Sequence, residues 1–277
     1  MILLDGTKVS LERAEALKEK VVALGFVPKL VIFQVGNRAD STSYIKRKKD
    51  YGAKLGFDVE LKNFPEDISQ EELEKEVDNA NKDDSVHGII VQLPLPDHLD
   101  SNKIINHISE NKDADGLTSA SIYKLVNNEK GTVPATARGI LTMLNAYDVE
   151  VTGKKVVVVG RSLLVGKSTA LNLINNDATV TVAHRKTENL QAITKQADIL
   201  IVAIGQPQMI TKDYIGEGQV VVDVGISPLD ETIKGDVHFD NVKDIVGAIS
   251  PVPGGVGPMT VVSLFENVMD LIESNNG

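Results

Sequence analysis

Short runs of mostly apolar residues recur along the chain. Valine and isoleucine dominate them, as in KLVIFQV and KVVVVG, and most lack the strict alternation of a strand with one solvated face. Strands that are apolar throughout are typical of parallel sheets, which are covered on both faces. We therefore predict strands over residues 29–35, 57–64, 87–93, 155–160, 178–184, 198–205 and 219–225.

Segments with a helical period separate these strands, most clearly residues 10–25 and 69–83. Alternating strands and helices predict an α/β fold, with helices on both faces of parallel sheets. The alternation loosens over residues 96–152, which carry helix-like segments and loops. We interpret this stretch as the crossing from a first α/β unit to a second one built around residues 150–250.

The net charge and the apolar content of the chain indicate which kinds of partner it does not bind. Lys and Arg total 29 of the 277 residues against 39 Asp and Glu, so the formal net charge is −10. An acidic chain is repelled by nucleic acids and anionic membranes, and we expect neither as a partner. No apolar run approaches the roughly 18 residues of a membrane span, and the start, MILLDGTKVS, does not resemble a secretory signal.

The chain has no cysteine, and its five histidines form no paired metal motif. Disulfides, thiolate nucleophiles and cysteine-bound metals are therefore excluded, and we expect no metal site. A chain without cysteine fits a reducing compartment, so we expect a cytoplasmic protein.

The segment GKKVVVVGRSLLVGKSTALNLI, residues 153–174, raises the question of a phosphate ligand. A nucleotide P-loop has four residues between its first glycine and GK[ST], whereas five separate Gly160 from Gly166. The GxGxxG fingerprint also fails, because Ser162 replaces its second glycine. A buried strand, a glycine turn and a helix nevertheless suit the pyrophosphate of a dinucleotide. A tight turn without a ligand stays open as the alternative.

The next predicted strand ends in the basic residues His184, Arg185 and Lys186. An acidic residue at this point would receive the ribose of NAD, whereas a cationic end favours the 2′-phosphate of NADP. Arg161 offers a second positive contact. A solvated basic turn is the competing interpretation.

A lysine falls on the inward face of a predicted helix over residues 41–56. At ~100° per residue, Lys48 shares one stripe with Ser41, Tyr44, Ile45, Gly52 and Leu55, while Lys46, Asp50 and Lys54 lie opposite. Partial burial favours the neutral form of an amine, which suits proton transfer near neutral pH. A snorkelling lysine beside a packing tyrosine is the alternative.

Three further segments supply polar or rigid groups. Gln92 ends an apolar strand that Pro94 stops, at the edge where open parallel sheets bind ligands. Asp115 precedes Gly116 in a loop, which by itself indicates only a turn. The segment ISPVPGGVGPMT, residues 249–260, is too rigid for a linker, and its glycines permit close approach of the backbone to a ligand. The helix that follows is expected to dock back on the protein.

Taken together, these segments resemble the bifunctional methylenetetrahydrofolate dehydrogenase/methenyltetrahydrofolate cyclohydrolase family. VGNRADSTSYIKRK, VQLPLP, KDADG, VVVVGRSLLVGK, GQP, DVGI and PVPGGVGPMT stand in the family's order, essentially from end to end. The resemblance implies two domains with a cleft between them. A folate-binding catalytic domain would comprise residues 1–117 and 259–277, and a Rossmann-like, doubly wound NADP-binding domain residues 118–258.

The resemblance also implies the activity: NADP-dependent oxidation of 5,10-methylenetetrahydrofolate, then hydrolysis of the methenyl product to 10-formyltetrahydrofolate. This is one-carbon metabolism, which serves purine biosynthesis. By matching position, Lys48 is the general acid/base, Gln92 tunes it, Tyr44 stacks on the folate and Asp115 binds the pterin. The implied substrate contacts are completed by Ser41, Pro253, Gly254 and Gly255, and the implied cofactor contacts are Thr136, Gly160, Arg161, Ser162, Gly166, His184, Arg185, Ile226 and Gly257.

The chain departs from the family pattern in places. Ala135 and Ala137 replace a cysteine and a proline, and Arg185 stands where serine is usual. Ser227 and Ser250 replace Asn and Thr, with small expected effect. The resemblance implies a homodimer. Two alternatives are a monofunctional NADP dehydrogenase acting on a related small substrate and a catalytically silent nucleotide-binding protein.

Overall fold

The structure is a computed structural model that describes residues 1–229 and 232–275, leaving aside the side chains of residues 39–41, 43 and 229. The chain forms two compact units. Unit 1 comprises Met1–Glu12 and Thr136–Ser263, and unit 2 comprises Arg13–Ala135 and Leu264–Gly277. The functional domains inferred from the sequence, with limits at residues 117 and 258, stay a prediction.

Unit 2 is built on a three-stranded parallel sheet in the order β3 (Asp58–Phe64), β2 (Lys29–Val35), β4 (Gly88–Val91). Each predicted strand forms within two residues of its expected ends. The central strand β2 is buried along almost its whole length, as its apolar sequence requires.

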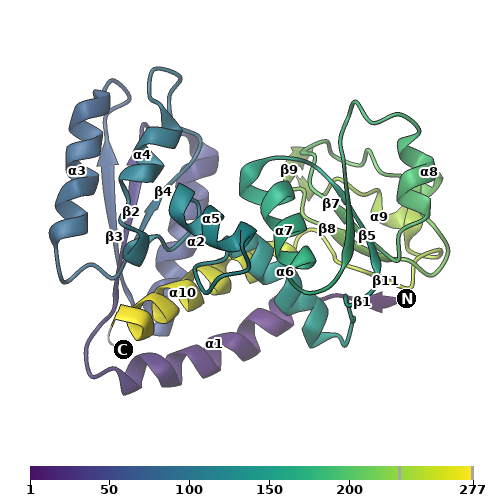
Figure 1. Ribbon diagram of the computed structural model, residues 1–277, viewed down its shortest axis with the longest axis horizontal. Helices are drawn as coiled ribbons and strands as arrows, with labels where there is room; N and C mark the ends of the chain where they lie inside the picture. The colour runs from purple at the N-terminus through teal and green to yellow at the C-terminus, as the bar shows by residue number, and fades with distance from the viewer. Residues whose placement is uncertain (230–231, 276–277) are drawn as a thin grey trace. The chain divides into compact units, whose positions relative to one another are not determined.

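Helices cover both faces of this sheet (Figure 1). Helices α3 (Gln70–Lys82) and α4 (Ser101–His107) pack on one face, where Val31 and Phe33 join a buried cluster with Leu73 of α3. On the other face, a side chain at Gly52 of α2 (Ala39–Leu55) would collide with Val59 and Phe265, so α2 packs tightly against β3 and α10 (Val256–Asn275). Two short helices follow α4, η1 (Glu110–Lys112) and α5 (Ser119–Val126).

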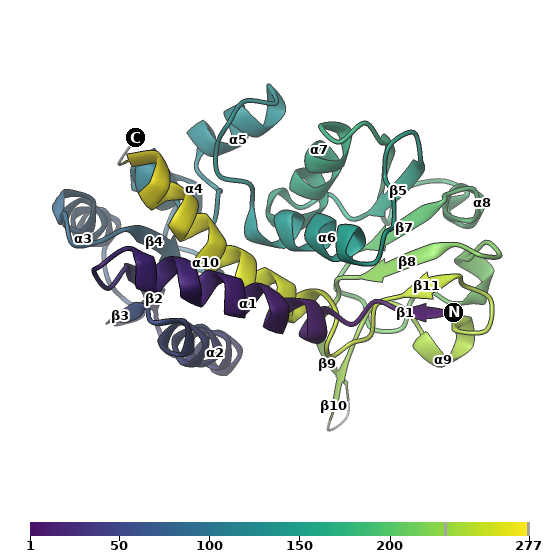
Figure 2. The same cartoon turned by 90° about the horizontal axis from the view of Figure 1, so that it is seen from below.

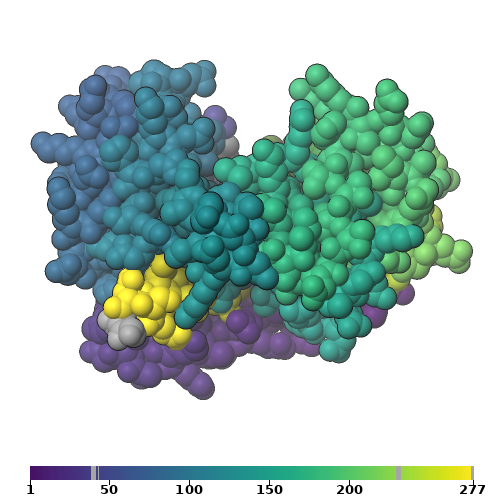
Figure 3. Space-filling model, in the orientation of Figure 1, coloured from purple at the N-terminus to yellow at the C-terminus, as the bar shows by residue number. Residues whose placement is uncertain are grey.

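The C-terminal helix docks back on unit 2, as the sequence predicts. The unit 2 parts of α1 (Gly6–Ala23) and α10 run side by side (Figure 2), and the last turns of α10 reach the surface beside α1 (Figure 3). Arg13 Nη2 lies 2.6 Å from Glu266 Oε1, and Lys20 Nζ lies 3.0 Å from Glu273 Oε1.

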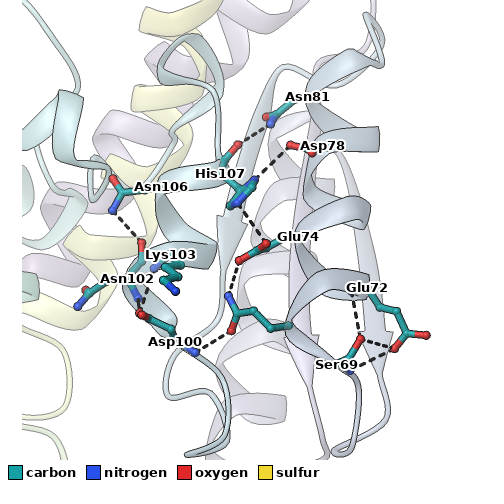
Figure 4. A network of polar contacts seen from close by, with 11 residues as sticks. Ser69, Glu72, Glu74, Asp78, Asn81, Asp100, Asn102, Lys103, Asn106 and His107 are labelled. Carbon is teal, nitrogen blue, oxygen red and sulfur yellow. Dashed lines mark hydrogen bonds and ion pairs between the residues drawn. The ribbon is translucent and has the colours of Figure 1, made fainter.

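Polar contacts fix the ends of α3 and join it to α4 (Figure 4). Ser69 and Glu72 form a capping box at the start of α3. The ring of His107, at the end of α4, lies 3.4 Å from both Glu74 Oε2 and Asp78 Oδ1 of α3. These contacts fix the start of α3 and hold α3 and α4 together.

Unit 1 contains a six-stranded, entirely parallel sheet in the order β1-β11-β8-β7-β5-β6. The strands are β1 (Ile2–Leu3), β5 (Lys155–Val159), β6 (Thr179–Ala183), β7 (Ile199–Val202), β8 (Val220–Asp223) and β11 (Ala248–Ile249). Four of these six strands match predicted runs. The two-residue strands β1 and β11 were not predicted, because so short a segment carries no periodic signal.

Helices flank the unit 1 sheet on both sides, with α6 (Ala135–Ala146) and α7 (Ser168–Ile174) on one side and α8 (Leu190–Lys195) and α9 (Phe239–Val242) on the other (Figure 1). The remaining elements are η2 (Leu163–Lys167), η3 (Lys212–Tyr214) and an antiparallel pair, β9 (Ser227–Leu229) and β10 (Thr232–Lys234). This arrangement confirms the predicted α/β class with a Rossmann-like parallel sheet. Within the described residues, no helix could cross a membrane.

Candidate active site

Lys48 lies on the partly buried face of α2, as the helical projection predicts. Ile45, Gly52 and Leu55 are buried along this face, whereas Lys46 and Lys54 on the opposite side are exposed. Helix α2 ends at Gly56, whose left-handed backbone (φ 90°) lets its amide bond back to the carbonyl of Ala53. Tyr44, one turn before Lys48, is also partly buried. Ser41 belongs to the same helix, but its side chain lies outside the described residues.

Gln92 joins Lys48 at the carboxyl end of β4. The Lys48 amine donates a hydrogen bond to Gln92 Oε1 at 3.2 Å, and Gln92 Nε2 donates to the carbonyl oxygen of Leu93 at 2.9 Å. A carbonyl oxygen can only accept, so the bond to Leu93 directs the amide oxygen of Gln92 at the lysine. The strand end and the helix thus bring together two residues 44 positions apart.

Asp115 reaches the same place on a loop anchored by Asp113. The buried carboxylate of Asp113 accepts hydrogen bonds from the amides of Gly116 (2.9 Å) and Thr118 (2.8 Å) and from Ser121 Oγ (2.7 Å). The sequence motifs point to Asp115 and leave Asp113 without a role. Both aspartates stand in KDADG, and nothing in that segment distinguishes the buried anchor from its neighbour.

Lys48 and Asp115 influence each other electrostatically. Burial lowers the pKa of Lys48, and the negative charge of Asp115 opposes this effect. Burial raises the pKa of Asp115, while Lys48 lowers it and Asp113 raises it further. Burial thus favours the neutral form of each group, and their mutual attraction favours the charged form of each. Perturbed groups of this kind are typical of functional sites.

Space for a ligand exists at the carboxyl edge of the unit 2 sheet. A groove of about 940 Å³ follows the ends of the three strands and is lined by residues 35–38, 63–66 and 94–98. Ligands of open parallel sheets gather at this edge. Gln92 stands at the same edge, two residues before Pro94, although Lys48, Gln92 and Asp115 are not among the residues that line the groove.

In unit 1, the glycine turn after β5 is compact and closely packed. A Cβ atom on Gly160 (φ 141°) would lie 2.3 Å from the carbonyl oxygen of Ala203, and one on Gly166 would lie 2.3 Å from the carbonyl oxygen of Gly160. Five residues separate Gly160 from Gly166, one more than separate the first and last glycines of GxGxxG. A single π-turn accommodates the extra residue, and in it the amide of Lys167 donates a hydrogen bond to the carbonyl of Ser162 at 2.9 Å. Strand, turn and helix therefore keep the order of a dinucleotide site.

The basic residues predicted to contact a 2′-phosphate lie in the turn after β6, on the strand adjacent to β5. His184 Nδ1 accepts a hydrogen bond from the amide of Lys186 at 3.2 Å, which closes the turn. Arg185 is exposed there, and Arg161 is exposed in the glycine turn. Parallel neighbours place the two turns at the same edge of the sheet.

The remaining predicted cofactor residues also lie in unit 1. Thr260 Oγ1 and Thr136 Oγ1 are 3.2 Å apart, and a Cβ on Gly257 would lie 3.6 Å from Ile226 Cδ1. Thr136 and Thr260 are therefore joined by a hydrogen bond between their hydroxyls, and Gly257 packs beside the side chain of Ile226.

The predicted substrate residues Pro253, Gly254 and Gly255 belong to unit 1 as well. The carbonyl of Gly254 accepts a hydrogen bond from the amide of Thr7 at 2.9 Å, and a Cβ on Gly6 would lie 1.9 Å from the carbonyl oxygen of Gly255. This glycine pair is therefore pressed against the start of α1. Across the described ranges, no cluster of three or more His, Asp or Glu side chains could hold a metal ion.

Comparison with known proteins identifies the family. The tetrahydrofolate dehydrogenase/cyclohydrolase catalytic domain model matches residues 4–115, and the NAD(P)-binding domain model of the same family matches residues 134–276. The bifunctional protein FolD of Bacillus thuringiensis (strain Al Hakam) is 45% identical over 274 residues, covering 97% of this chain and 96% of the relative.

Solved structures agree. The bifunctional FolD enzyme of Campylobacter jejuni superposes with a TM-score of 0.97 at 40% identity, with 99% of each chain covered. The FolD enzyme of Trypanosoma brucei, solved with NADP cofactor and inhibitor, gives a TM-score of 0.95 at 35% identity, covering 100% of this chain and 98% of the other. With both family models matched in order and relatives similar over nearly its whole length, this chain belongs to the tetrahydrofolate dehydrogenase/cyclohydrolase family.

Proposed function

We propose that this protein oxidises 5,10-methylenetetrahydrofolate to the 5,10-methenyl cation with NADP and hydrolyses that cation to 10-formyltetrahydrofolate. The observation that carries the proposal is the partly buried Lys48, bonded to Gln92 and electrostatically coupled to Asp115. Family membership supports both activities, and the relatives described above are bifunctional by name.

Lys48 serves the hydrolytic step. Water adds to the methenyl carbon, and the neutral amine of Lys48 accepts the proton that this water loses. The bond from that carbon to N5 then breaks, and the lysine ammonium returns its proton to N5. The formyl C=O forms as the added hydroxyl loses its proton, so one proton is released for each water consumed. The low pKa of Lys48 increases the fraction of neutral amine available for the first transfer.

Gln92 and Asp115 orient the reacting groups. The Lys48 amine donates one of its hydrogens to the amide oxygen of Gln92. This bond restricts the direction in which the lone pair of the neutral amine points. The carboxyl of Asp115 accepts from the amino-pyrimidinone edge of the pterin, and Tyr44 offers its ring for stacking. Ser41, Pro253, Gly254 and Gly255 complete the proposed substrate contacts.

The glycine turn of unit 1 fits NADP. When bound, NADP supplies the acceptor for the hydride. The close approaches at Gly160 and Gly166 allow only glycine at both ends of the turn, and the turn leads from a buried strand into a helix, which suits a pyrophosphate. Arg161, Ser162, His184 and Arg185 would hold the phosphates, with Arg185 at the 2′-phosphate. Thr136, Ile226 and Gly257 are the further proposed contacts.

A homodimer is the proposed assembly, with β6 as the interface. This strand is the edge of the unit 1 sheet, yet it exposes side chains on both faces, including Val182 (42% exposed), and Ile174 at the end of α7 is 50% exposed. Parallel strands are normally covered on both faces. A second copy paired antiparallel along β6 would extend both sheets and cover these residues by a two-fold axis.

The net charge of −10 supports a small-molecule partner rather than nucleic acid, and the absence of cysteine supports a cytoplasmic location. Two assays test the proposed activities. Purified protein is supplied with methylenetetrahydrofolate and NADP, and NADPH formation is measured. Loss of methenyltetrahydrofolate absorbance without NADP then reports the hydrolysis.

Lys48→Met should lose hydrolysis by at least two orders of magnitude, because the remaining groups do not accept the proton. Lys46→Met, on the exposed side of the same helix, is the matched control and should keep both activities. Hydrolysis at the normal rate in Lys48→Met would refute the assignment of the lysine.

A further inference from the structure

Two acidic side chains with no role assigned above are buried at the carboxyl end of the unit 1 sheet, one of them at the start of the DVGI segment. Asp223 ends β8 and is 3% exposed, and Asp236 is fully buried. The sheet register aligns Val159, Val202 and Asp223 as the last paired residues of β5, β7 and β8. The loops that leave this row form the edge at which a Rossmann-like sheet binds its ligand.

Asp223 ties the chain after β8 to the segment after β10. Its Oδ1 accepts hydrogen bonds from the amides of Gly225 (3.0 Å) and Asp236 (2.9 Å), and its Oδ2 accepts from the amide of Val237 (2.9 Å). Ser250 Oγ also accepts from the amide of Asp223 at 2.8 Å. The hydroxyl that the family pattern places at this position is therefore kept by Ser250.

Asp236 continues the connection to the loop after β7. A single carboxylate oxygen, Oδ2, accepts from the amides of Ile204 (2.7 Å) and Gly205 (2.9 Å). Gly205 is the first residue of the GQP segment, and Ile204 directly precedes it. One buried side chain therefore fixes the direction in which the chain leaves β7.

Two glycines make room for the two carboxyl groups. A Cβ on Gly225 would lie 2.2 Å from Cγ of Asp236, and a Cβ on Gly235 would lie 1.9 Å from Oδ2 of Asp223. Each carboxyl group thus occupies the place that a side chain on the other segment would fill. Residues 223–225 and 235–237 therefore pack into each other. Neither segment can move without displacing a buried carboxyl group of the other.

The loop held by Asp236 supports the glycine turn. The carbonyl oxygen of Ala203, directly before Ile204, is the atom 2.3 Å from the position of a Cβ on Gly160. The backbone of the β7 loop and the turn after β5 are therefore in close contact. Displacement of residues 204 and 205 would carry Ala203 toward or away from the turn that is proposed to bind the pyrophosphate.

Burial perturbs both carboxyl groups. Burial raises the pKa of Asp223 to about 7 in spite of its amide donors, and burial raises the pKa of Asp236 as well. Apolar side chains would avoid this desolvation but would leave five backbone amides without their acceptors. Strongly perturbed acids at a ligand edge are typical of functional sites.

We propose that Asp236 is a positioning residue for the NADP site, which holds the loop after β7, and through Ala203 the glycine turn, in the form that binds the dinucleotide. This inference rests on the proposed function. Asp223 supports Asp236 through its main-chain amide. Neither acid needs to touch the cofactor.

The test uses the full chain and separates cofactor binding from the hydrolysis at Lys48, which requires no NADP. The dissociation constant of NADP, the KM for NADP, the kcat of oxidation and the rate of hydrolysis are measured for each variant. Asp236→Ala should weaken NADP binding at least tenfold and raise the KM for NADP, with hydrolysis within twofold of the unsubstituted protein.

Asp236→Asn should keep most of the affinity for NADP. The amides of Ile204 and Gly205 both bond to a single oxygen of Asp236, and the asparagine side chain still offers one oxygen. Asp240→Asn changes an exposed acid four residues on and is the matched control, which should leave NADP binding unchanged.

Unchanged NADP affinity in folded Asp236→Ala would overturn the proposal, and so would an equal loss of hydrolysis, which would mark a general structural role. If the alanine variant does not fold, Asp236→Ser decides by the same measurements, since serine is too short to reach both amides. Failure of both to fold, with Asp236→Asn folded, would also overturn the proposal. Failure of the unsubstituted protein to bind NADP would instead refute the proposed function.

Discussion

The amide oxygen of Gln92 accepts a hydrogen bond from the Lys48 amine at 3.2 Å, and the bond from Gln92 Nε2 to Leu93 keeps that oxygen facing the lysine. A neutral acceptor at this distance orients the amine without adding charge. The protonation of Lys48 is therefore left to burial, which lowers its pKa, and to Asp115, which raises it. This division of roles makes the pH dependence of hydrolysis a direct test of the site.

Gln92→Glu and Asp115→Asn should shift the pH profile in opposite directions. Lys48 acts as a base only when deprotonated, so kcat/KM for hydrolysis falls as the pH drops below its pKa. A glutamate beside the amine raises that pKa and should move the acidic limb to higher pH by about one unit or more. Asp115→Asn removes a charge that raises the pKa, so the limb should move to lower pH.

The measurement is the rate of methenyltetrahydrofolate loss across pH, with saturation curves at each pH to separate weaker binding from the shifted limb. Shifts of the same sign in both variants would contradict the assigned roles.

Asp113→Asn should loosen the loop that carries Asp115. The NH2 group of asparagine would face a donor that now bonds to a carboxylate oxygen of Asp113. Two buried donors would then meet and stay unpaired, at a cost of about 2–3 kcal/mol. The free energy of unfolding in urea, followed by circular dichroism, should fall by this amount, and the KM for folate should rise. Asp67→Asn, at an exposed position, is the control and should stay within about 0.5 kcal/mol. Equal stability of the two variants would show that Asp113 is no anchor.

Gly160→Ala should weaken NADP binding at least tenfold, because its Cβ would collide with the carbonyl oxygen of Ala203. Gly153→Ala is the matched control: its φ of +73° is also left-handed, but no atom lies within 4 Å of its Cβ. Both variants place a Cβ at positive φ, which costs about 1–3 kcal/mol, and only Gly160→Ala adds the collision. Calorimetric titration with NADP checks this expectation, and equal affinities would show that close packing of the turn does not matter for the cofactor.

Val182→Lys should dissociate the proposed homodimer. A lysine on an edge strand disfavours pairing with another copy, because its charge would be buried in the interface. Light scattering coupled to size-exclusion chromatography should give the mass of one chain instead of two. Val22→Lys, at a valine 81% exposed on α1, should leave the mass unchanged. A dimer that persists in Val182→Lys would place the interface elsewhere.

Local patterns in the sequence suffice for the positions of most elements. The stripe containing Ile45, Lys48 and Leu55 follows from the period of one helix, and the apolar run before Gln92 ends where Pro94 prevents its continuation. Such features depend on neighbours within a few residues along the chain. The strands β1 and β11 were not predicted, because a pair of only two residues leaves no local pattern.

The tertiary structure decided which of the polar residues act together. Asp113 and Asp115 are alike in sequence, but only packing made one a buried anchor and left the other beside Lys48. The interlocking of Asp223 with Gly235 and of Asp236 with Gly225 joins segments that are separate along the chain, so no local pattern announced it. The sequence by itself determined where most strands and helices form, because apolar residues recur with the period of the element that buries them. The fold decided the ionisation and orientation of the site, because desolvation and hydrogen bonding depend on groups brought together from distant positions.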